Sequence, residues 1–431
     1  MLALPCLLYS MDLTVLNLAV PALSADLEPS SAQLLWIVDI YGFLVAGSLI
    51  TMGTLGDRIG RRKLLLIGAA AFGIASVVAA CSTSAGMLIA SRALLGVAGA
   101  TLAPSTLSLI RTLFHDPEQR TFAIGVWITS YSVGAAIGPL LGGVLLQYFW
   151  WGSVFLLGVP VMVLLLALGP KLLPEYRDRD AGRIDLTSAA MSLVAILAVI
   201  YGLKLLAQDG LDGRSAVPIA VGAAVGAAFV RRQRRLQDPL VDLRLFRSPA
   251  FSASLTAYML ATFLAFGVFV FVAQYLQLVL GLSPLQAGLW TMPWPLGFVV
   301  GSLLTPRLVR RTSPAALMAG GLLVAAVGFA LLGRLDVSSS PALFVASSVL
   351  FSLGLAPVFT LATDLVVGSV PPERAGTAAA LSETSSELGG ALGIAVLGSI
   401  GVAVYRSGMS RGLPEALPHD AAAAARDTLG G

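Results

Sequence analysis

Hydrophobic residues occur along this chain in long stretches separated by short polar segments. A helix needs about 20 apolar residues to cross a bilayer, and thirteen stretches are near or above that length. Because a backbone in hydrocarbon must bond its own polar groups, each stretch predicts a helix. The predicted spans cover residues 2–23, 34–55, 64–81, 87–110, 121–148, 153–173, 186–206, 216–230, 251–279, 286–306, 315–333, 342–369 and 375–404.

The composition agrees with many membrane spans. Of the 431 residues, 57% are hydrophobic and 12% are charged, about half the charged fraction of a typical soluble domain. The two cysteines, Cys6 and Cys81, lie in separate spans, so neither a disulfide framework nor a cysteine metal site is predicted. The sequence has no GxxxxGK[ST] loop and no nucleophile–base constellation, which argues against ATP as the energy source and against an enzyme.

Lysine and arginine concentrate in alternate connectors. Twenty of the twenty-seven lie in connectors that follow even-numbered spans, and five lie in the opposite connectors and the tail. Positive connectors stay in the cytoplasm, so this set and the N-terminus are predicted to be cytoplasmic. Residue 1 already lies at the edge of a span, and thirteen spans leave the C-terminus outside. We therefore expect a leader and a last helix to be missing from this sequence.

An aspartate lies halfway along the first span, in the stretch LLYSMDLTVLNLAVP. Placing the carboxylate of Asp12 there costs about 2.5–3.5 kcal/mol. The protonated group is neutral and easier to bury, whereas the ionised group attracts a cation. Asp12 is therefore predicted to serve a proton or cation carrier, although a buried acid can also serve only to bond a neighbouring helix.

A second acidic group lies in LSETSSELGGALG, within the last span. Glu383 and Glu387 are four residues apart, so they share one face of a helix, in its cytoplasmic half. Two close carboxylates do not both ionise readily, so one is expected to hold a proton. The alternative for Glu383 is solvation near the interface.

The connector GTLGDRIGRRK follows the second span. Its glycines allow a tight turn and a close approach of helices. Asp57 can pair with an arginine and with a helix N-terminus, which would make a latch that movement breaks. The alternative is a basic anchor that only fixes topology. The candidate gate residues here are Gly53, Gly56, Asp57, Arg58, Gly60, Arg61 and Arg62.

Four stretches resemble motifs of the major facilitator superfamily. GTLGDRIGRRK is similar to its signature loop, in the correct connector. MDLTVLNLAVPAL, IASRALLGVAGATLAPST and GAAIGPLLGGVLL resemble the first-, fourth- and fifth-helix motifs of its drug:proton antiporter branch. With LWIVDIY and a fourteen-span layout that lacks its last helix, the chain is similar to the QacA-type exporters of quaternary ammonium compounds and dyes.

The resemblance implies an all-α major facilitator fold of two six-helix bundles with two inserted helices. Residues 1–175 would form the N-terminal bundle, 176–250 the inserted helices and a cytoplasmic linker, and 251–431 the C-terminal bundle, with five spans and an external tail. The bundles would rock around a site near the midplane.

The implied function is proton-coupled export of lipophilic cationic drugs, dyes and quaternary ammonium compounds across the cytoplasmic (inner) membrane. The proton gradient would supply the energy without a cofactor or metal. The expected partners are protons, small lipophilic cations and the lipid bilayer, with no nucleic acid, and the protein is expected to act as a monomer.

The resemblance also implies roles for two charges within spans. Asp39, near the outer end of the second span, becomes a candidate proton site, and Arg92, in the fourth, a proton-coupling partner of an acid. A solvated helix-end acid and a purely structural ion pair are the alternatives. The tenth span, TMPWPLGFVVGSLL, lacks an acid that this branch can carry, which favours monovalent over divalent cations.

The fifth span contains SVGAAIGPLLGG, in which Gly134, Gly138 and Gly142 recur every four residues. This spacing makes a smooth face for close packing, and Pro139 removes a backbone hydrogen bond and kinks the helix. We expect a tight seam between the bundles that closes a leak path. Ordinary small-residue packing would produce the same spacing.

Aromatic rings can bind a lipophilic cation, worth about 0.5–2 kcal/mol each, although most membrane aromatics only pack or lie at interfaces. The candidates for substrate binding are Asp12, Glu387, Trp127, Tyr131, Tyr258 and Trp294.

Two alternatives to multidrug export stay open. One is a proton-coupled exporter of one endogenous metabolite or lipid-like compound. The other is a membrane receptor or scaffold with a transporter fold, which would not need titratable groups along the path.

Overall fold

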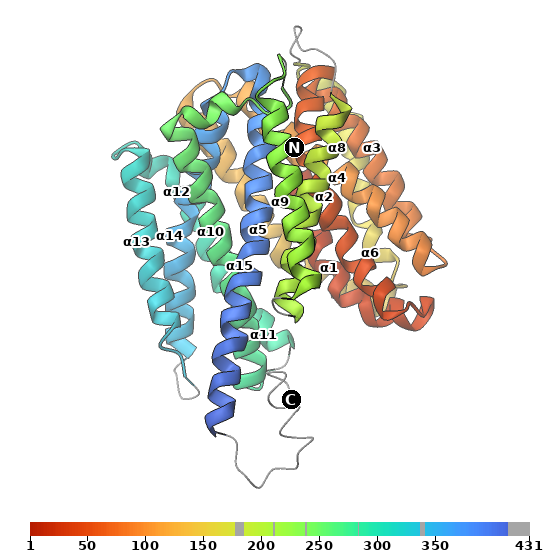
Figure 1. Ribbon diagram of the computed structural model, residues 1–431, viewed down its shortest axis with the longest axis vertical. Coiled ribbons are helices and arrows are strands. Elements are labelled where there is room, and N and C mark those ends of the chain that lie inside the picture. The colour runs from red at the N-terminus through yellow and green to blue at the C-terminus, as the bar shows by residue number, and fades with distance from the viewer. Residues whose placement is uncertain (177–184, 210–211, 238, 283, 337–340, 413–431) are drawn as a thin grey trace.

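The structure is a computed structural model that describes residues 1–176, 185–209, 212–237, 239–282, 284–336 and 341–412 (Figure 1). Within these residues all regular secondary structure is helical. Its elements are α1 (Leu4–Leu27), α2 (Ser31–Ile59), α3 (Arg61–Ala80), α4 (Ala85–Leu113), α5 (Pro117–Tyr148), α6 (Ser153–Leu156), α7 (Gly158–Leu172), α8 (Leu186–Asp209), α9 (Gly213–Gln233), η1 (Leu243–Arg247), α10 (Pro249–Gln274), η2 (Tyr275–Val279), α11 (Pro284–Thr291), α12 (Pro293–Val309), α13 (Pro314–Leu332), α14 (Pro341–Gly368), η3 (Pro372–Arg374) and α15 (Ala375–Gly412).

Each predicted span corresponds to one helix or to two consecutive helices. In the described residues, ten helices are long and apolar enough to cross a membrane. The predicted spans 2–23, 286–306 and 375–404 correspond to α1, to α11 with α12, and to α15. The all-α fold with many spans is therefore confirmed, whereas the fourteen-span layout stays a prediction.

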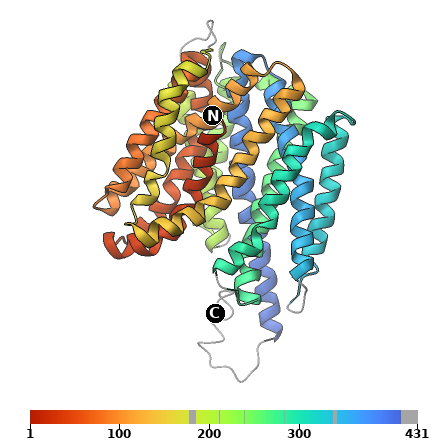
Figure 2. The same cartoon turned by 180° about the vertical axis from the view of Figure 1, so that it is seen from behind.

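Two groups of helices lie side by side in both views of the molecule (Figures 1 and 2). We call α1–α7 the first bundle and α10–α15 the second. Helix α15 packs along α10 and also contacts α2 and α4 of the first bundle. Helices α8 and α9 pack on each other, and α8 lies against α2 and α15. The domain boundaries at residues 175 and 250 stay predictions.

The beginning of α1 and the end of α15 lie at opposite ends of the molecule (Figure 1). The connections α2–α3 and α9–α10 and the turn η3 lie at the end where the chain begins. We call it the basic end, because arginine and lysine concentrate in its connectors.

Polar side chains begin several helices at the connectors. Ser30 starts α2 with a reciprocal cap, in which its hydroxyl accepts from the backbone of Gln33 and the Gln33 side chain accepts from the backbone of Ser30. Asp116 and Ser313 cap α5 and α13 in the same position. Because these side chains satisfy free N–H groups of the first turn, the helices can start directly at short connectors.

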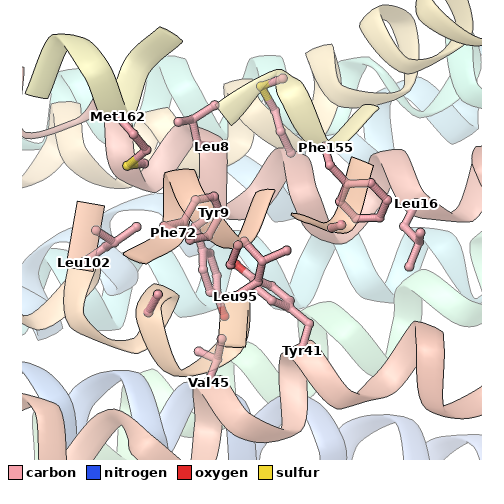
Figure 3. Packing of buried hydrophobic residues seen from close by; sticks show 14 of the residues in the cluster. Leu8, Tyr9, Leu16, Tyr41, Val45, Phe72, Leu95, Leu102, Phe155 and Met162 are labelled. Atoms are coloured by element: carbon pink, nitrogen blue, oxygen red, sulfur yellow. The ribbon is translucent and has the colours of Figure 1, made fainter. Parts of the chain in front are cut away.

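The largest apolar cluster fills the first bundle (Figure 3). Small residues bring its helices close together: Gly68 of α3 faces Thr101 of α4, and Gly96 of α4 faces the backbone carbonyl of Tyr41. Large apolar side chains also point outward, such as Ile74 and Leu323, which are 67% and 71% exposed. A surface of this kind suits contact with lipid.

Candidate functional site

Two buried charges from different helices meet inside the first bundle. Helix α1 carries Asp12 and α4 carries Arg92, and the Arg92 Nη1 lies 3.6 Å from the Asp12 Oδ2. The guanidinium also lies over two aromatic rings, 5.3 Å from the centre of Tyr41 and 5.8 Å from that of Phe155. Breaking such a buried pair leaves an uncompensated charge. Arg92 is thus placed to respond to the charge on Asp12.

A small cavity of about 20 Å³ adjoins Asp12 and is lined by Phe72 and Phe155 among others. That volume is enough for one water molecule. The Asp12 Oδ2 and the Arg92 Nη1 have no hydrogen-bond partner among the described residues. The ion pair of Asp12 with Arg92 therefore has no hydrogen bond between these two atoms and lies beside a space that one water molecule can occupy.

The second acidic centre lies on α15, where it meets the first bundle. Glu383 is 8% exposed, and its Oε1 has no hydrogen-bond partner among the described residues. Tyr258 of α10 lies beside this carboxyl group. Glu387 accepts a hydrogen bond from the Tyr9 hydroxyl of α1 at 2.8 Å. In the described part of the chain no lysine or arginine forms an ion pair with either glutamate.

Two tyrosines connect the acidic centres. The Tyr9 ring lies 6.0 Å from the Tyr41 ring, and the two are neighbours in the buried cluster (Figure 3). Tyr41 in turn lies under Arg92. Because Tyr9 and Asp12 are three residues apart on α1, they lie on the same side of that helix. A displacement of α1 at one centre would therefore be felt at the other.

Asp39, the third predicted proton site, is already paired. It forms an ion pair with Lys204 of α8, and the Lys204 ammonium lies 5.7 Å from the Phe43 ring. The pair joins α8 to α2. A role of Asp39 in proton transfer stays a prediction.

Asp57, near the end of α2, binds the first turn of α15. Its carboxylate accepts from the Thr377 hydroxyl at 2.9 Å, the Thr377 backbone N–H at 3.0 Å and the Gly376 backbone N–H at 3.4 Å. It also forms an ion pair with Arg61, whose Nη1 donates to the Gly53 carbonyl at 3.0 Å. The acid, the arginine and the helix N-terminus are thus together, as predicted, and they join the two bundles. Their action as a latch stays a prediction.

Local contacts and Glu175 hold the turn between α2 and α3. Gly60 has a φ of +113°, a conformation that glycine adopts readily. The Glu175 carboxylate beside it accepts from the backbone N–H of Arg62 at 3.2 Å. Gly56 is buried against the Arg61 side chain, and Arg58 is half-buried at the end of α2. These contacts fix the turn between α2 and α3.

The prediction for the glycines of α5 was wrong in one respect. A Cβ at Gly134 would lie 2.2 Å from a backbone carbonyl of α1, and one at Gly142 would lie 2.9 Å from Val15 of α1. Gly138 is buried, and Pro139 lies within the same helix. Both α1 and α5 belong to the first bundle, so this seam lies inside a bundle rather than between the two. Gly134 and Gly142 face α1, whereas other positions of α5 contact α12 and α14 of the second bundle.

The contact of α5 with the second bundle lies nearer the basic end. A Cβ at Gly125 would lie 3.0 Å from the backbone of Ser302 on α12. Asp364 of α14, to which the sequence assigned no function, accepts hydrogen bonds from Arg120 at 2.5 Å and from Thr121 at 2.6 Å. These contacts form a second connection between the bundles.

The predicted aromatic residues fall into two places. Trp127 and Tyr131 of α5 have ring centres 4.9 Å apart, and Tyr131 lies 5.7 Å from Tyr9, so they adjoin the glutamate centre. Trp294 instead packs on Phe351 within the second bundle, with ring centres 4.7 Å apart. The ring of Trp294 therefore packs inside the second bundle, and its role in substrate binding stays a prediction.

Sequence reasoning missed several residues of the site. Tyr9 could have been found, because it precedes Asp12 by three residues on the same helix face. Lys204 could have been singled out as a charged residue within the predicted span 186–206, but the sequence does not indicate its partner. Thr377 carries no sequence signal, because its role depends on the approach of α2 to α15.

Comparisons with known proteins relate this arrangement to transporters. The family model of the Major Facilitator Superfamily matches residues 2–394. The multidrug efflux pump LfrA of Mycolicibacterium smegmatis is 44% identical over 430 residues, which cover 100% of this chain and 85% of that protein. The methyl viologen resistance protein SmvA of Salmonella typhimurium is 36% identical over 394 residues, covering 90% and 79% of the two chains.

One more resistance protein and one solved structure are also similar to this chain. The puromycin resistance protein pur8 of Streptomyces alboniger is 36% identical over 403 residues, covering 91% of this chain and 79% of that protein. Among solved structures, the human organic anion transporter MFSD10 matches with a TM-score of 0.69 and 19% identity, covering 93% of this chain and 92% of that one. At that identity the match concerns the fold.

Proposed function

Because this chain belongs to the major facilitator superfamily, we propose that it is a proton-coupled antiporter that exports lipophilic cationic drugs, dyes and quaternary ammonium compounds. It is a multi-pass membrane transporter and not an enzyme. The names of its relatives, which include a multidrug efflux pump and a methyl viologen resistance protein, support drug export.

One observation carries the proposal. Glu383 and Glu387 are carboxyl groups at the contact between the bundles, and no basic side chain pairs with them in the described residues. A buried carboxylate without a cation is unstable. Such a group is stabilised by a proton or by a cationic ligand, and the exchange of one for the other is the reaction of a cation–proton antiporter.

The proposed cycle uses both acidic centres. A lipophilic cation from the cytoplasm binds at Glu387, among the rings of Tyr9 and Tyr131, and displaces a proton. After the bundles rock, a proton from outside displaces the cation. A second proton from outside neutralises Asp12 and frees Arg92, which favours the return, and Asp12 releases this proton to the cytoplasm before the next cycle, so one net charge moves inward per cation exported. Each net charge that moves down the potential supplies about 2.3 kcal/mol per 100 mV.

The proposed orientation follows the basic connectors. The basic end and the N-terminus face the cytoplasm, and the protein acts as a monomer in the cytoplasmic membrane. The contact of Asp57 with α15 serves as the latch that closes this end while the other end is open.

Ethidium export from energised inverted vesicles tests the proposal. Glu387→Gln and Asp12→Asn each remove a proton site, so both are expected to lose export. Asp116→Asn is the matched control, because asparagine also caps a helix. Full export by Asp12→Asn and Glu387→Gln would contradict the proposal.

Export of a single compound is the second candidate, and the names of some relatives favour it, such as a tetracenomycin C resistance and export protein. If dyes are not transported but wild-type cells secrete one metabolite that a deletion strain retains, this candidate replaces multidrug export.

A further inference from the structure

The connector between α9 and α10 enters the space between the bundles at the basic end. Leu240 and Val241 are 1% and 3% exposed. They belong to one apolar cluster with Ile50 of α2, Val366 of α14 and Ala378 of α15. Connectors normally run over the surface, so this burial indicates that the segment has a structural role.

A buried glutamine holds the connector in place. The side-chain carbonyl of Gln233, at the end of α9, accepts from the backbone N–H of Leu240 at 2.7 Å and from that of Val241 at 3.3 Å. Its amide donates to the Ser188 hydroxyl of α8 at 2.7 Å. These bonds satisfy backbone groups that burial would otherwise leave without partners. The connector is thereby fixed to the pair α8–α9.

The same short segment is bonded to both bundles. The Thr54 hydroxyl of α2 donates to the Leu240 carbonyl at 3.1 Å and lies 3.4 Å from the Thr377 hydroxyl of α15. Asp242 accepts from the Arg374 Nη1 at 2.8 Å. Arg374 ends η3 and directly precedes α15. Residues 240–242 therefore contact the bundles where Asp57 joins them.

The entry to α15 is held from two sides. On one side the Tyr176 hydroxyl donates to Glu373 of η3. On the other side Asp242 holds Arg374. Opening of the basic end would separate α15 from α2. It would either break the bonds of the connector with Thr54 and Arg374 or move the connector together with one of the bundles.

We propose that residues 240–242 are part of the gate at the basic end, and that α8 and α9 hold these gate residues in position. The inserted helices then set how readily this end opens. The inference rests on the alternating access of the proposed function, but it does not depend on which ions or drugs are exchanged.

Distances between spin labels test the inference in the purified full chain. The labels are placed on Lys63→Cys of α3 and Arg311→Cys beyond α12, both exposed, with Cys6→Ala and Cys81→Ser as background. Arg374→Gln removes the bond to the second bundle, and Gln233→Leu releases the connector. Each is expected to raise the population with the longer distance several-fold.

Arg244→Gln is the matched control. Arg244 bonds the same carboxylate, Asp242, at 3.0 Å, but from within the connector, so this variant is expected to keep the closed distribution. The exchanged pair Asp242→Arg with Arg374→Asp is expected to restore closure. Closed distributions in both Arg374→Gln and Gln233→Leu, identical to that of Arg244→Gln, would overturn the inference. The label distances in the connector variants and ethidium export by Glu387→Gln are separate measurements. Either proposal can therefore fail while the other stands.

Discussion

Individual side chains at the buried centres differ in their partners. Asp12 faces Arg92 and Asp39 faces Lys204, whereas Glu383 and Glu387 have no basic partner among the described residues. A carboxylate beside a cation is stabilised in its ionised form, and one without a cation is available to a proton or a cationic substrate. In the proposed function, exchange therefore takes place at the glutamates, and Asp12 with Arg92 gives the coupled response.

Tyr9→Phe tests the bond between α1 and Glu387. The variant keeps the ring and removes the hydroxyl that donates to the carboxylate. A hydrogen bond to a charged group is worth about 1.5–3 kcal/mol, so we expect ethidium to bind about 10-fold more weakly or worse. Titration of ethidium fluorescence with purified protein measures the Kd. Tyr201→Phe, on the exposed side of α8, is the control, and equal affinities in both variants would show that Tyr9 does not support the site.

A double-mutant cycle tests the pairing of Asp12 with Arg92. Removal of one partner of a buried pair costs about 3–5 kcal/mol, so Arg92→Gln and Asp12→Asn should each lower the Tm in detergent. The Tm of the double variant should fall by much less than the sum of the two single decreases. Additive losses would show that the two groups do not interact.

The sequence predicted the buried acids better than their partners. An acid within an apolar span, such as Asp12 or Glu387, is evident from hydrophobic pattern alone. The partner of Asp39 could not be predicted, because Lys204 reaches it only when α8 packs against α2. Such packing is a tertiary property that no local pattern records.

At the scale of helices, the closest approaches occur where a side chain is absent. Helix α5 lies so near α1 at Gly134 that a Cβ would meet a backbone carbonyl of α1 at 2.2 Å. The sequence predicted a tight seam from the spacing of glycines, and the seam is present. The prediction placed the seam between the bundles, and the structure has it within the first bundle, because spacing shows that one face is smooth and does not show what packs on it.

Gly134→Ala tests this contact. The added methyl group forces α1 and α5 apart, and overpacking of this kind costs about 1–3 kcal/mol. We expect a Tm several degrees below that of the wild type, measured by thermal unfolding in detergent. Gly143 lies on the same helix, and no atom lies within 4 Å of the position that a Cβ would take there, so Gly143→Ala should keep the wild-type Tm. Equal Tm values for the two variants would contradict the packing of α1 on α5.

At the scale of the whole molecule, the bundles are joined at the basic end through two seams. One joins α2 to α15 through Asp57, and the other joins α5 to α14 through Asp364. The basic end is therefore closed in this structure. The two-bundle fold could be predicted from the family resemblance of the motifs, whereas the closed state could not, because it depends on contacts such as that of Asp57 with Thr377.

Two acids at the basic end, Glu373 and Asp242, have lowered pKa values. The Tyr176 hydroxyl donates to Glu373 and lowers its pKa. Burial acts to raise the pKa of Asp242, but the bonds from Arg244 and the charge of Arg374 outweigh it, and the pKa is lowered. A carboxyl group with a lowered pKa stays ionised, and keeps its bonds, at any pH above its ordinary pKa of about 4. It loses these bonds only as the pH falls below that range.

The label distance between positions 63 and 311 is therefore expected to stay the same from about pH 8 to about pH 6 without substrate. Pulsed dipolar spectroscopy of the doubly labelled protein measures it. A basic end that opens over this range would show that other titrating groups control the gate.

The exchange of a proton for a cation is the central claim, and proton release on substrate binding tests it most directly. Ethidium is added to purified protein in weakly buffered detergent solution, and the protons released per bound cation are measured with a pH indicator. The account predicts release by the wild type and by Asp116→Asn, and a strong loss of release by Glu387→Gln and by the double variant with Glu383→Gln. Undiminished release by that double variant would contradict it.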